Sequence, residues 1–284
     1  MSYIVLVDSA SDIPFDLATS EGIITVPMTV NIDGKTLYEG VDINTKDFYA
    51  CFNDFIELPK TSQPNPKTLL EHYEKILSEG NDVVAIHLSS SLSSTMSTAQ
   101  MIRSMTSAPE RVHIIDSLGA SFGHGMLALF AQQILRSMKS WEDAEAKIIS
   151  IRNNMRYVFT LDTLEYLVKG GRVGKTAGFI GGLLDVKPIL HITRDGRIEP
   201  FSKVRSRRAA IKKLVDTMEL DIFYPEQQVI GISHSACLDD ANILADEIRQ
   251  RFQVKEIWIS EIGCVVGSHT GPGTLALFYQ HKLS

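Results

Sequence analysis

The sequence predicts an α/β protein of two domains: an N-terminal three-layer α/β/α domain with a mainly parallel sheet, and a C-terminal α/β domain with a mixed sheet. Three observations support this prediction. Apolar strand patterns alternate with helical patterns over the first half of the chain, as in parallel strands joined by crossover helices. The pattern changes near residue 157, and a hairpin signal follows. At 284 residues, the chain is long enough for two hydrophobic cores.

The N-terminal domain, residues 1–156, is predicted from alternating strand and helix patterns. The strand patterns lie at Tyr3–Val7, Ile23–Ile32, Val83–Leu88 and Val112–Ile115. The helical patterns lie near Lys67–Leu77, Ser94–Met105, Gly119–Met138 and Trp141–Met155. Asp12 with Pro14 is typical of a helix start, because Asp caps a helix and proline is tolerated in its first turn. Polar residues follow the strands, and we expect them at one edge of the sheet: Asp8, Ser9, Ser89 to Ser93, Asp116 and Ser117.

The C-terminal domain, residues 157–284, is predicted to be a mixed sheet with helices. Asp195-Gly196 separates two strand-like runs, Val186–Thr193 and Ile198–Val204, which predicts a hairpin. Other strand patterns lie at Tyr157–Leu161, Gln228–Ser233, Ile257–Ile262 and Thr274–Gln280. Helical patterns lie at Thr163–Lys169, Arg205–Met218 and Asp239–Phe252. The hairpin joins two strands directly, whereas helical patterns separate other strands of this domain, so the sheet is expected to be mixed.

Composition excludes several classes of protein. The chain is 44% apolar and 22% charged, as in ordinary globular proteins. Its formal net charge of -6 argues against nucleic-acid binding, which needs concentrated Lys and Arg. The basic run Lys203–Arg208 is interpreted as a solvated helix start. No apolar stretch approaches the ~18 residues of a membrane span, so no stable membrane anchor is expected.

Cysteine usage and the chain start favour a cytoplasmic location. Cys51, Cys237 and Cys264 are widely spaced and odd in number, so they indicate neither a disulfide framework nor a zinc site. The apolar run Tyr3–Val7 has no positive flank and stops at Asp8, unlike a signal peptide. We therefore expect a protein of the reducing cytoplasm.

Hydroxyl-rich loops form the candidate binding site. The strand pattern Asp82–Leu88 runs straight into Ser89–Thr95, where a helix is expected to begin. A second hydroxyl cluster is Thr61–Pro64, and a glycine-rich tail, Gly263–Gly273, encloses His269. Helix capping accounts for a few such residues, but five serines and a threonine within seven positions exceed what one cap needs. Hydroxyls and the N–H groups of a helix start donate to anions, which predicts capture of a small anionic head group.

Other motif-like runs do not fit a catalytic or cofactor site. Gly170–Thr176 is not a phosphate loop, because Lys169 stands where that motif needs glycine. Gly271–Ala276 lies too close to the end of the sequence for a dinucleotide-binding unit. Gly231–Ser235 lacks the second glycine of a nucleophile elbow. No His, Cys, Asp or Glu cluster has metal-ligand spacing, so neither a metal nor a cofactor is predicted.

An ordered set of segments spread over nearly the whole chain is more specific than any one motif. The segments are Asp8–Asp12, Thr61–Pro64, Ser90–Thr95, Leu164–Arg172, Val186–Leu190 and Gly267–Gly273. Together they resemble the DegV family, whose better-studied members bind fatty acids and serve a bacterial fatty acid kinase. The resemblance implies a two-domain α/β protein with a buried tunnel between the domains. Its ligand would be a long-chain fatty acid such as palmitate.

The resemblance also implies roles for individual residues. Thr61 and Ser93 occupy the positions that hold the ligand carboxylate in the family. A supporting polar network would include Ser62, Ser94, Thr95, Arg205 and His269. The chain itself would perform no chemistry, and a partner kinase would phosphorylate the presented carboxyl group to an acyl phosphate for phospholipid synthesis.

The match to the family has departures, and other functions stay open. Ser94 stands where the family usually has glycine, Met96 where tyrosine is common, and Ala276 where glycine is frequent. These leave the preference for chain length and unsaturation open. The alternative is a serine esterase or acyl transferase with Ser93 as nucleophile and His269 as base. A third hypothesis is a lipid-sensing module that binds another protein.

The residue types fit a fatty acid. A tail of ~14 methylenes gains roughly 11 kcal/mol on burial before ordering costs. Hydroxyls can hold the head without a tight ion pair, which leaves the carboxylate nucleophilic enough for phosphorylation. The apolar runs Phe179–Leu184 and Met126–Phe130 are candidates to line the tunnel.

Overall fold

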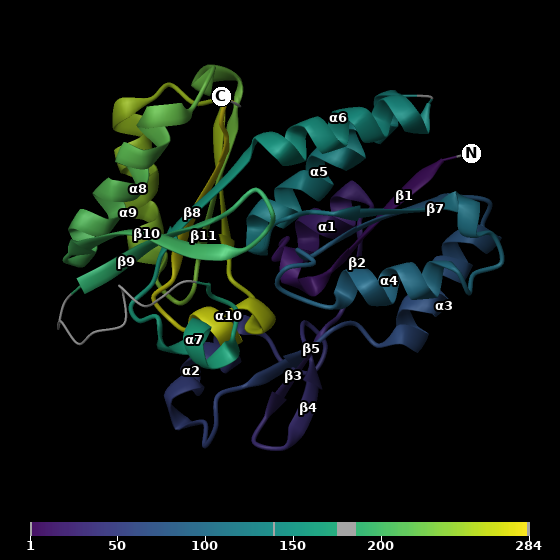
Figure 1. Ribbon diagram of the computed structural model, residues 1–284, viewed down its shortest axis with the longest axis horizontal. Coiled ribbons are helices and arrows are strands. Elements are labelled where there is room, and N and C mark those ends of the chain that lie inside the picture. Colours follow the sequence, from purple (N-terminus) through teal and green to yellow (C-terminus); the bar gives the residue numbers. More distant parts are fainter. Residues whose placement is uncertain (1, 139, 175–185, 283–284) are drawn as a thin grey trace.

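A four-stranded parallel sheet organises the first half of the chain (Figure 1). The computed structural model describes residues 2–138, 140–174 and 186–282. The sheet order is β2-β1-β6-β7, and all three pairings are parallel. Its strands are β1 (Tyr3–Asp8), β2 (Ile24–Val26), β6 (Asp82–His87) and β7 (Val112–Asp116). Every residue of β6 is buried, as expected for a central strand covered on both faces.

Helices cover both faces of the parallel sheet, which confirms the predicted three layers. On one face, α3 (Pro66–Ser78) and α4 (Thr95–Arg103) pack Leu69 and Ile102 against Val83. On the other face, α5 (Ser121–Ser137) and α6 (Trp141–Asn154) pack against β1 and β6. The short α1 (Phe15–Glu21) joins the same core through Ala18.

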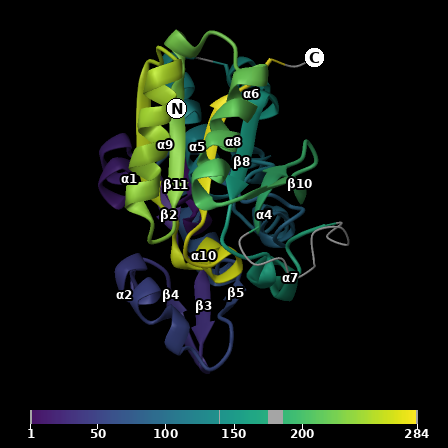
Figure 2. The ribbon, with the colours of Figure 1, turned by 90° about the vertical axis from the view of Figure 1, so that its left-hand side faces the viewer.

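The second half of the chain forms a six-stranded mixed sheet, as predicted. Its order is β10-β9-β8-β13-β11-β12; only β11 and β12 pair in parallel. The strands are β8 (Met155–Thr160), β9 (Val186–Ile192), β10 (Ile198–Arg205), β11 (Val229–His234), β12 (Glu256–Glu261) and β13 (Leu275–Gln280). Helices α8 (Arg207–Asp221) and α9 (Leu238–Arg251) cover one face of this sheet (Figure 2).

Helix α5 lies between the two sheets and joins them. Its residues Met126 and Leu127 belong to one continuous core with Val5 of β1 and with Phe159 and Phe278 of the mixed sheet. Among the described residues, none of the helices is long and apolar enough to cross a membrane.

A third, small sheet corrects one prediction. The run Ile23–Ile32 was expected to be one strand, but it divides into β2 and a separate strand, β3 (Thr29–Ile32). Pro27 lies between them and has no N–H to donate to a continuing ladder. Strand β3 pairs antiparallel with two others in the order β4-β3-β5, namely β4 (Lys35–Tyr38) and β5 (Lys60–Ser62). This sheet packs near α2 (Thr45–Ala50) at the lower end of the molecule (Figure 1).

Two helix starts also differ from the predictions. Helix α1 begins at Phe15 after Pro14, and Asp12 does not cap it. The Asp12 backbone instead ends a 3₁₀ turn at φ 48°, and its carboxylate bonds elsewhere. Helix α8 begins at Arg207, so Arg205 is the last residue of β10. The 3₁₀ turns are η1 (Ser9–Ser11), η2 (Phe52–Asp54), η3 (Pro109–Arg111) and η4 (Pro225–Gln227).

The glycine-rich tail contains a helix that the sequence analysis did not predict. Helix α10 (Cys264–Thr270) runs between Gly263 and Gly271, and Gly271 has a φ of 73°. The flanking glycines were interpreted as loop signals, whereas they bound a helix of only seven residues. A second short helix, α7 (Glu165–Gly170), was predicted within two residues of its actual bounds and packs beside α10.

Candidate lipid site

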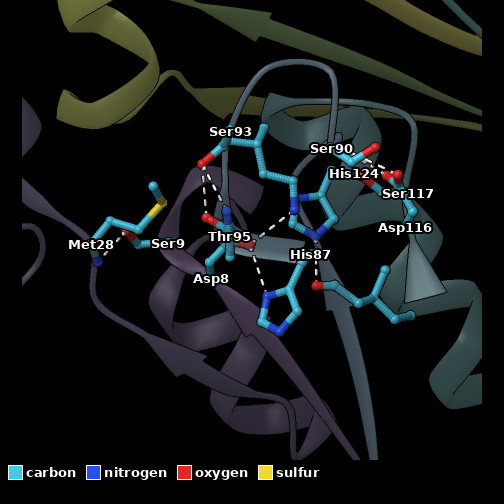
Figure 3. Close-up of polar contacts among 12 residues, drawn as sticks. Asp8, Ser9, Met28, His87, Ser90, Ser93, Thr95, Asp116, Ser117 and His124 are labelled. Carbon is cyan, nitrogen blue, oxygen red and sulfur yellow. Dashed lines mark hydrogen bonds and ion pairs between the residues drawn. The ribbon is translucent and has the colours of Figure 1, made fainter. Parts of the chain in front are cut away.

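The polar residues at the carboxyl ends of the parallel strands meet at one edge, as expected (Figure 3). Asp8 ends β1, and its Oδ2 accepts the Leu88 N–H at 2.9 Å and lies 3.0 Å from His87 Nδ1. Burial alone raises the pKa of Asp8, but the bonds from His87 and Leu88 hold that pKa below its usual range. Asp116 ends β7 and accepts from the Ser90 and Leu118 N–H groups. These carboxylates fix the start of the hydroxyl loop Ser89–Ser94.

Two serines of the hydroxyl loop attach it to the β9–β10 hairpin. Ser89 Oγ donates to the Gly196 carbonyl at 2.9 Å, and Ser91 Oγ donates to the Asp195 carbonyl at 2.6 Å. Gly196 has a φ of 78°, and an added Cβ would lie 2.1 Å from Ser89 Oγ. The position therefore requires glycine for its backbone angle and for space. Ser89 and Ser91 position the loop, which leaves Ser93 and Ser94 facing a cavity.

The cavity lies among the hydroxyl loop, β5, α7 and α10. Its volume is about 410 Å³, within the ~300–1,000 Å³ usual for small-molecule sites. Its polar lining consists of Thr61, Ser62, Gln63, Ser93, Ser94, Arg172, His269 and Thr270. Its apolar lining consists of Met28, Leu88, Leu92, Ala120, Leu167, Ile198, Val265 and Val266. A molecule with a polar head and a hydrocarbon tail matches this combination.

Thr61 and His269 form a direct pair although they lie 208 positions apart in the sequence. Thr61 Oγ1 on β5 lies 2.7 Å from Nε2 of His269 in the last turn of α10. Burial, together with a smaller effect of the nearby Arg172 guanidinium, lowers the pKa of His269 to about 4. The imidazole is therefore neutral near pH 7. It can donate to the threonine hydroxyl or accept from it, depending on its tautomer.

Ser93 and Ser94 immediately precede α4 and line the same cavity. Ser93 Oγ lies 2.8 Å from Thr95 Oγ1 and accepts the Thr95 N–H at 3.3 Å. Ser94 Oγ donates to Gln63 Oε1 at 2.7 Å, which connects the hydroxyl loop to the Thr61 loop. Thr95 is buried behind Ser93 and does not line the cavity. The structure thus brings Thr61, Ser62, Ser93, Ser94 and His269 together.

The arginine expected from the sequence is not at this cavity. Arg205 is exposed at the end of β10 and does not line it. The arginine that opens α8 is Arg207, which donates to the Gly273 carbonyl at 2.7 Å and so fixes the end of the tail. Arg172 lines the cavity instead, and its guanidinium donates to the Gly170 and Leu92 carbonyls. Arg172 ends the Gly170-Gly171-Arg172 signature, which was the available signal for it.

Apolar segments expected to line a tunnel have different positions. Met126–Phe130 lies in α5 within the core shared by the two sheets, and none of its residues lines the cavity. Phe179–Leu184 lies outside the described residues, as do Lys175 and Thr176 of the loop that was compared with a phosphate site. Met96 and Ala276, which depart from the family pattern, do not line the cavity either.

The geometry gives little support to hydrolysis by Ser93 and His269. Within the described part of the chain, no hydrogen bond joins these two side chains; each is paired with a threonine. A histidine with a pKa of about 4 is also a weak base near pH 7. No group of three or more His, Cys, Asp or Glu side chains in the described ranges is arranged to hold a metal ion.

Comparison with known proteins matches the whole described chain to one family. The family model described as an uncharacterised protein of the DegV family matches residues 2–282. A DegV domain-containing protein of Clostridium perfringens is 34% identical over 282 residues, covering 98% of this chain and 97% of that protein. A second DegV domain-containing protein, from Streptomyces coelicolor, is 33% identical over 275 residues, covering 96% of each chain.

Solved structures show the same fold. A DegV family protein from Thermus thermophilus, described by its fatty acid binding, superposes with a TM-score of 0.93 at 30% identity, covering 99% of this chain and 100% of that one. DegV from Bacillus subtilis, described as a fatty acid binding protein, gives a TM-score of 0.87 at 30% identity with the same coverage. The ordered motifs, the two sheets and these matches agree: the chain belongs to the DegV family.

Proposed function

We propose that this protein binds a long-chain fatty acid in the cavity and presents its carboxylate to a partner kinase, which forms an acyl phosphate. The observation that carries the proposal is the meeting of Thr61, Ser93 and His269 at one cavity whose remaining wall is largely apolar. The fatty acid binding of the relatives from Thermus thermophilus and Bacillus subtilis supports it.

The apolar wall supplies the affinity. Burial of each methylene is worth about 0.8 kcal/mol, so a palmitate-like tail gains roughly 11 kcal/mol before ordering costs. Leu88 and Leu92, from the loop between β6 and α4, and Ile198 of β10 offer such a surface. A tail bound there holds these segments together.

The hydroxyls hold the head group without neutralising it. When His269 carries its proton on Nε2, it donates to Thr61 Oγ1, and the Thr61 hydroxyl proton is free for the ligand carboxylate. Ser93 offers a second hydroxyl from the hydroxyl loop. Arg172 already donates to two backbone carbonyls, so it contributes positive potential rather than a bidentate clamp. A carboxylate held this way remains nucleophilic.

The head-group residues also face a second hollow, which supports presentation to a partner. Thr61, Arg172 and His269 line the first cavity and also one of about 590 Å³ beside Phe55–Lys60 and Tyr166. They therefore form a shared wall between the lipid cavity and this second hollow. A kinase that approaches through the second hollow would meet the carboxylate end of the ligand.

The proposal is tested first by lipid content. Mass spectrometry of an organic extract of the purified protein should recover an acyl chain, and the delipidated protein should bind palmitate. Thr61→Ala and Ser93→Ala should each weaken binding about tenfold, because each removes a charge-assisted hydrogen bond. Ser97→Ala is the control, since Ser97 is exposed on α4 and does not line the cavity. Unchanged affinity in the double variant would remove these assignments.

Presentation and hydrolysis are separated by two further assays. With a bacterial fatty acid kinase and ATP, palmitate on the wild-type protein should yield an acyl phosphate that hydroxylamine traps. Binding without phosphorylation would instead favour a lipid sensor. In a chromogenic ester assay, the wild type and Ser93→Ala should show the same background rate of hydrolysis. Hydrolysis by the wild type that is lost in Ser93→Ala would establish the esterase alternative.

A further inference from the structure

A cavity distinct from the lipid site is lined by basic side chains. It has a volume of about 230 Å³ and lies where the end of α6 and the start of β8 meet the β9–β10 hairpin and His281. Its polar lining includes Arg152, Asn153, Arg156, Tyr157, Thr193 and Arg194. No Asp or Glu is among its described lining residues.

The arginines of this cavity retain donor capacity. Arg152 donates only to neutral acceptors, the Asp116 carbonyl at 3.2 Å and Asn153 Oδ1 at 3.0 Å. Arg156 Nε lies 3.5 Å from Asp221 Oδ2, an ion pair that does not satisfy hydrogen-bond geometry, and this Nε has no hydrogen-bond partner in the described structure. Arg194 is exposed on the hairpin turn at the cavity mouth. The carboxylates of Asp221 and Asp116 lie nearby. Asp221 pairs with Arg156, and the Asp116 carboxylate accepts hydrogen bonds from backbone N–H groups.

A buried hydroxyl also lacks a partner at this cavity. Tyr157 is 3% exposed, and its hydroxyl forms no hydrogen bond with any described residue. A buried polar group without a partner costs about 1–3 kcal/mol, so such groups normally have one. The hydroxyl fits here because residue 119 is glycine: a Cβ at Gly119 would lie 2.2 Å from it. Burial raises the pKa of Tyr157, so the hydroxyl keeps its proton and can donate near neutral pH.

We propose that this cavity binds a small phosphate-bearing anion, either inorganic phosphate or a phosphomonoester, with Arg152, Arg156, Arg194 and the Tyr157 hydroxyl as donors. Guanidinium groups match the geometry of phosphate oxygens, and several donors converging on one small space suit an anion with three or four oxygens better than a carboxylate with two. The volume is below the ~300 Å³ of typical sites for larger ligands. The proposal does not depend on the fatty acid function.

The test is calorimetric titration of the delipidated full-length protein with inorganic phosphate, glycerol 3-phosphate and acetate near pH 7.5. Saturable binding of either phosphate compound, at least tenfold tighter than acetate, is expected, and the tighter of the two identifies the physiological class. Arg194→Gln should weaken phosphate binding about tenfold, because it removes a charged donor from an exposed position without disturbing the core. Tyr157→Phe should weaken it several-fold at unchanged or higher thermal stability.

The matched control is Arg197→Gln on the same hairpin. Arg197 is exposed and pairs with Asp195 at 3.0 Å, but it does not line the cavity. This variant should bind phosphate like the wild type. The proposal is overturned by an absence of saturable phosphate binding, by acetate binding as tightly as phosphate, or by equal effects of the Arg194 and Arg197 variants.

Discussion

Glu39 is a buried carboxyl group between the small sheet and α10. Its Oε1 accepts the Val265 N–H at 2.9 Å, and nearby Asp12 accepts the Gly263 N–H at 3.0 Å. Burial raises the pKa of Glu39 from 4.5 to about 7 and raises that of Asp12 well above its usual value. The pair thus holds the start of the helix that carries His269. Nothing in the sequence pattern around Glu39 distinguished it from an exposed loop residue.

The raised pKa of Glu39 predicts that stability falls as pH rises. The folded state binds a proton more tightly than the unfolded state, so this contribution is fully present below pH 4.5 and is lost as pH rises through about 7. At about 1.4 kcal/mol for each pKa unit, the loss is about 3 kcal/mol. The free energy of unfolding of Glu39→Gln, measured with urea, should therefore equal that of the wild type near pH 5 and be higher than that of the wild type at pH 8. The exposed Glu57→Gln is the control, and an equal pH slope in wild type and Glu39→Gln would contradict the prediction.

The neutral state of His269 is a second prediction at this scale. Because burial lowers its pKa to about 4, its NMR imidazole signals should not shift between pH 8 and about pH 5.5. The effect of His269 on the pH dependence of stability is opposite to that of Glu39. Because the folded state binds the proton less tightly, His269 lowers the free energy of unfolding as pH falls below 6.5 towards about 4. Signals that vanish in His269→Gln identify the residue, and a titration midpoint near 6.5 would show that the ring is solvated.

Residue types indicated which loops meet at the cavity, but the contacts between these loops were not predictable. The loops that contain Thr61 and Ser93 hold more hydroxyl side chains than helix capping needs, and both of these residues line the cavity. That Ser89 and Ser91 bond to the hairpin depends on tertiary approach, which no local pattern encodes. The expectation for Arg205 differs from the structure for a related reason: α8 begins two residues later, at Arg207, and neither of these arginines lines the cavity.

At the scale of elements, α7 and α10 meet through a glycine. Gly170 ends α7, and a Cβ added there would lie 2.5 Å from His269 Nδ1. Gly170→Ala should therefore push the imidazole away from Thr61 and weaken palmitate binding several-fold, with little effect on the backbone. Isothermal titration of the delipidated variant measures this.

The adjacent glycine is the matched control. Gly171 has a φ of 69° and open space around its Cα, so Gly171→Ala meets no atom but strains the backbone. It should lower the free energy of unfolding by about 1 kcal/mol and leave palmitate affinity unchanged. Equal loss of affinity in both variants would show that the turn as a whole, rather than the histidine contact, controls binding.

Strand and helix patterns predicted most elements, and the exceptions at Pro27 and α10 have identifiable physical causes. The buried run of β6 and the Asp195-Gly196 hairpin were found because burial and turn chemistry are local signals. The division at Pro27 was missed because apolar residues continue on both sides of it. Helix α10 was missed because it is short and packed on the small sheet, so tertiary contacts override its glycine-rich flanks.

At the scale of the whole molecule, the shared core around α5 predicts cooperative unfolding. The division at residue 156 remains a prediction, and the chain passes from α6 directly into β8 there. Trp141 stacks on His113 beside the parallel sheet, whereas Trp258 lies on the mixed sheet, and the chain has two tryptophans in all. In Trp141→Phe and Trp258→Phe, the remaining fluorophore should report the same urea midpoint as circular dichroism. Separate midpoints would mean that the halves fold independently.

The long chain distance between Thr61 and His269 has a kinetic consequence. This contact joins β5 of the small sheet to α10 across 208 positions, so its loop-closure cost is high and we expect it to be absent from the folding transition state. A fatty acid whose binding requires this contact therefore binds only the native state. Under the proposed function, added palmitate should slow unfolding without accelerating folding, so that a bound fatty acid prolongs the lifetime of the native state.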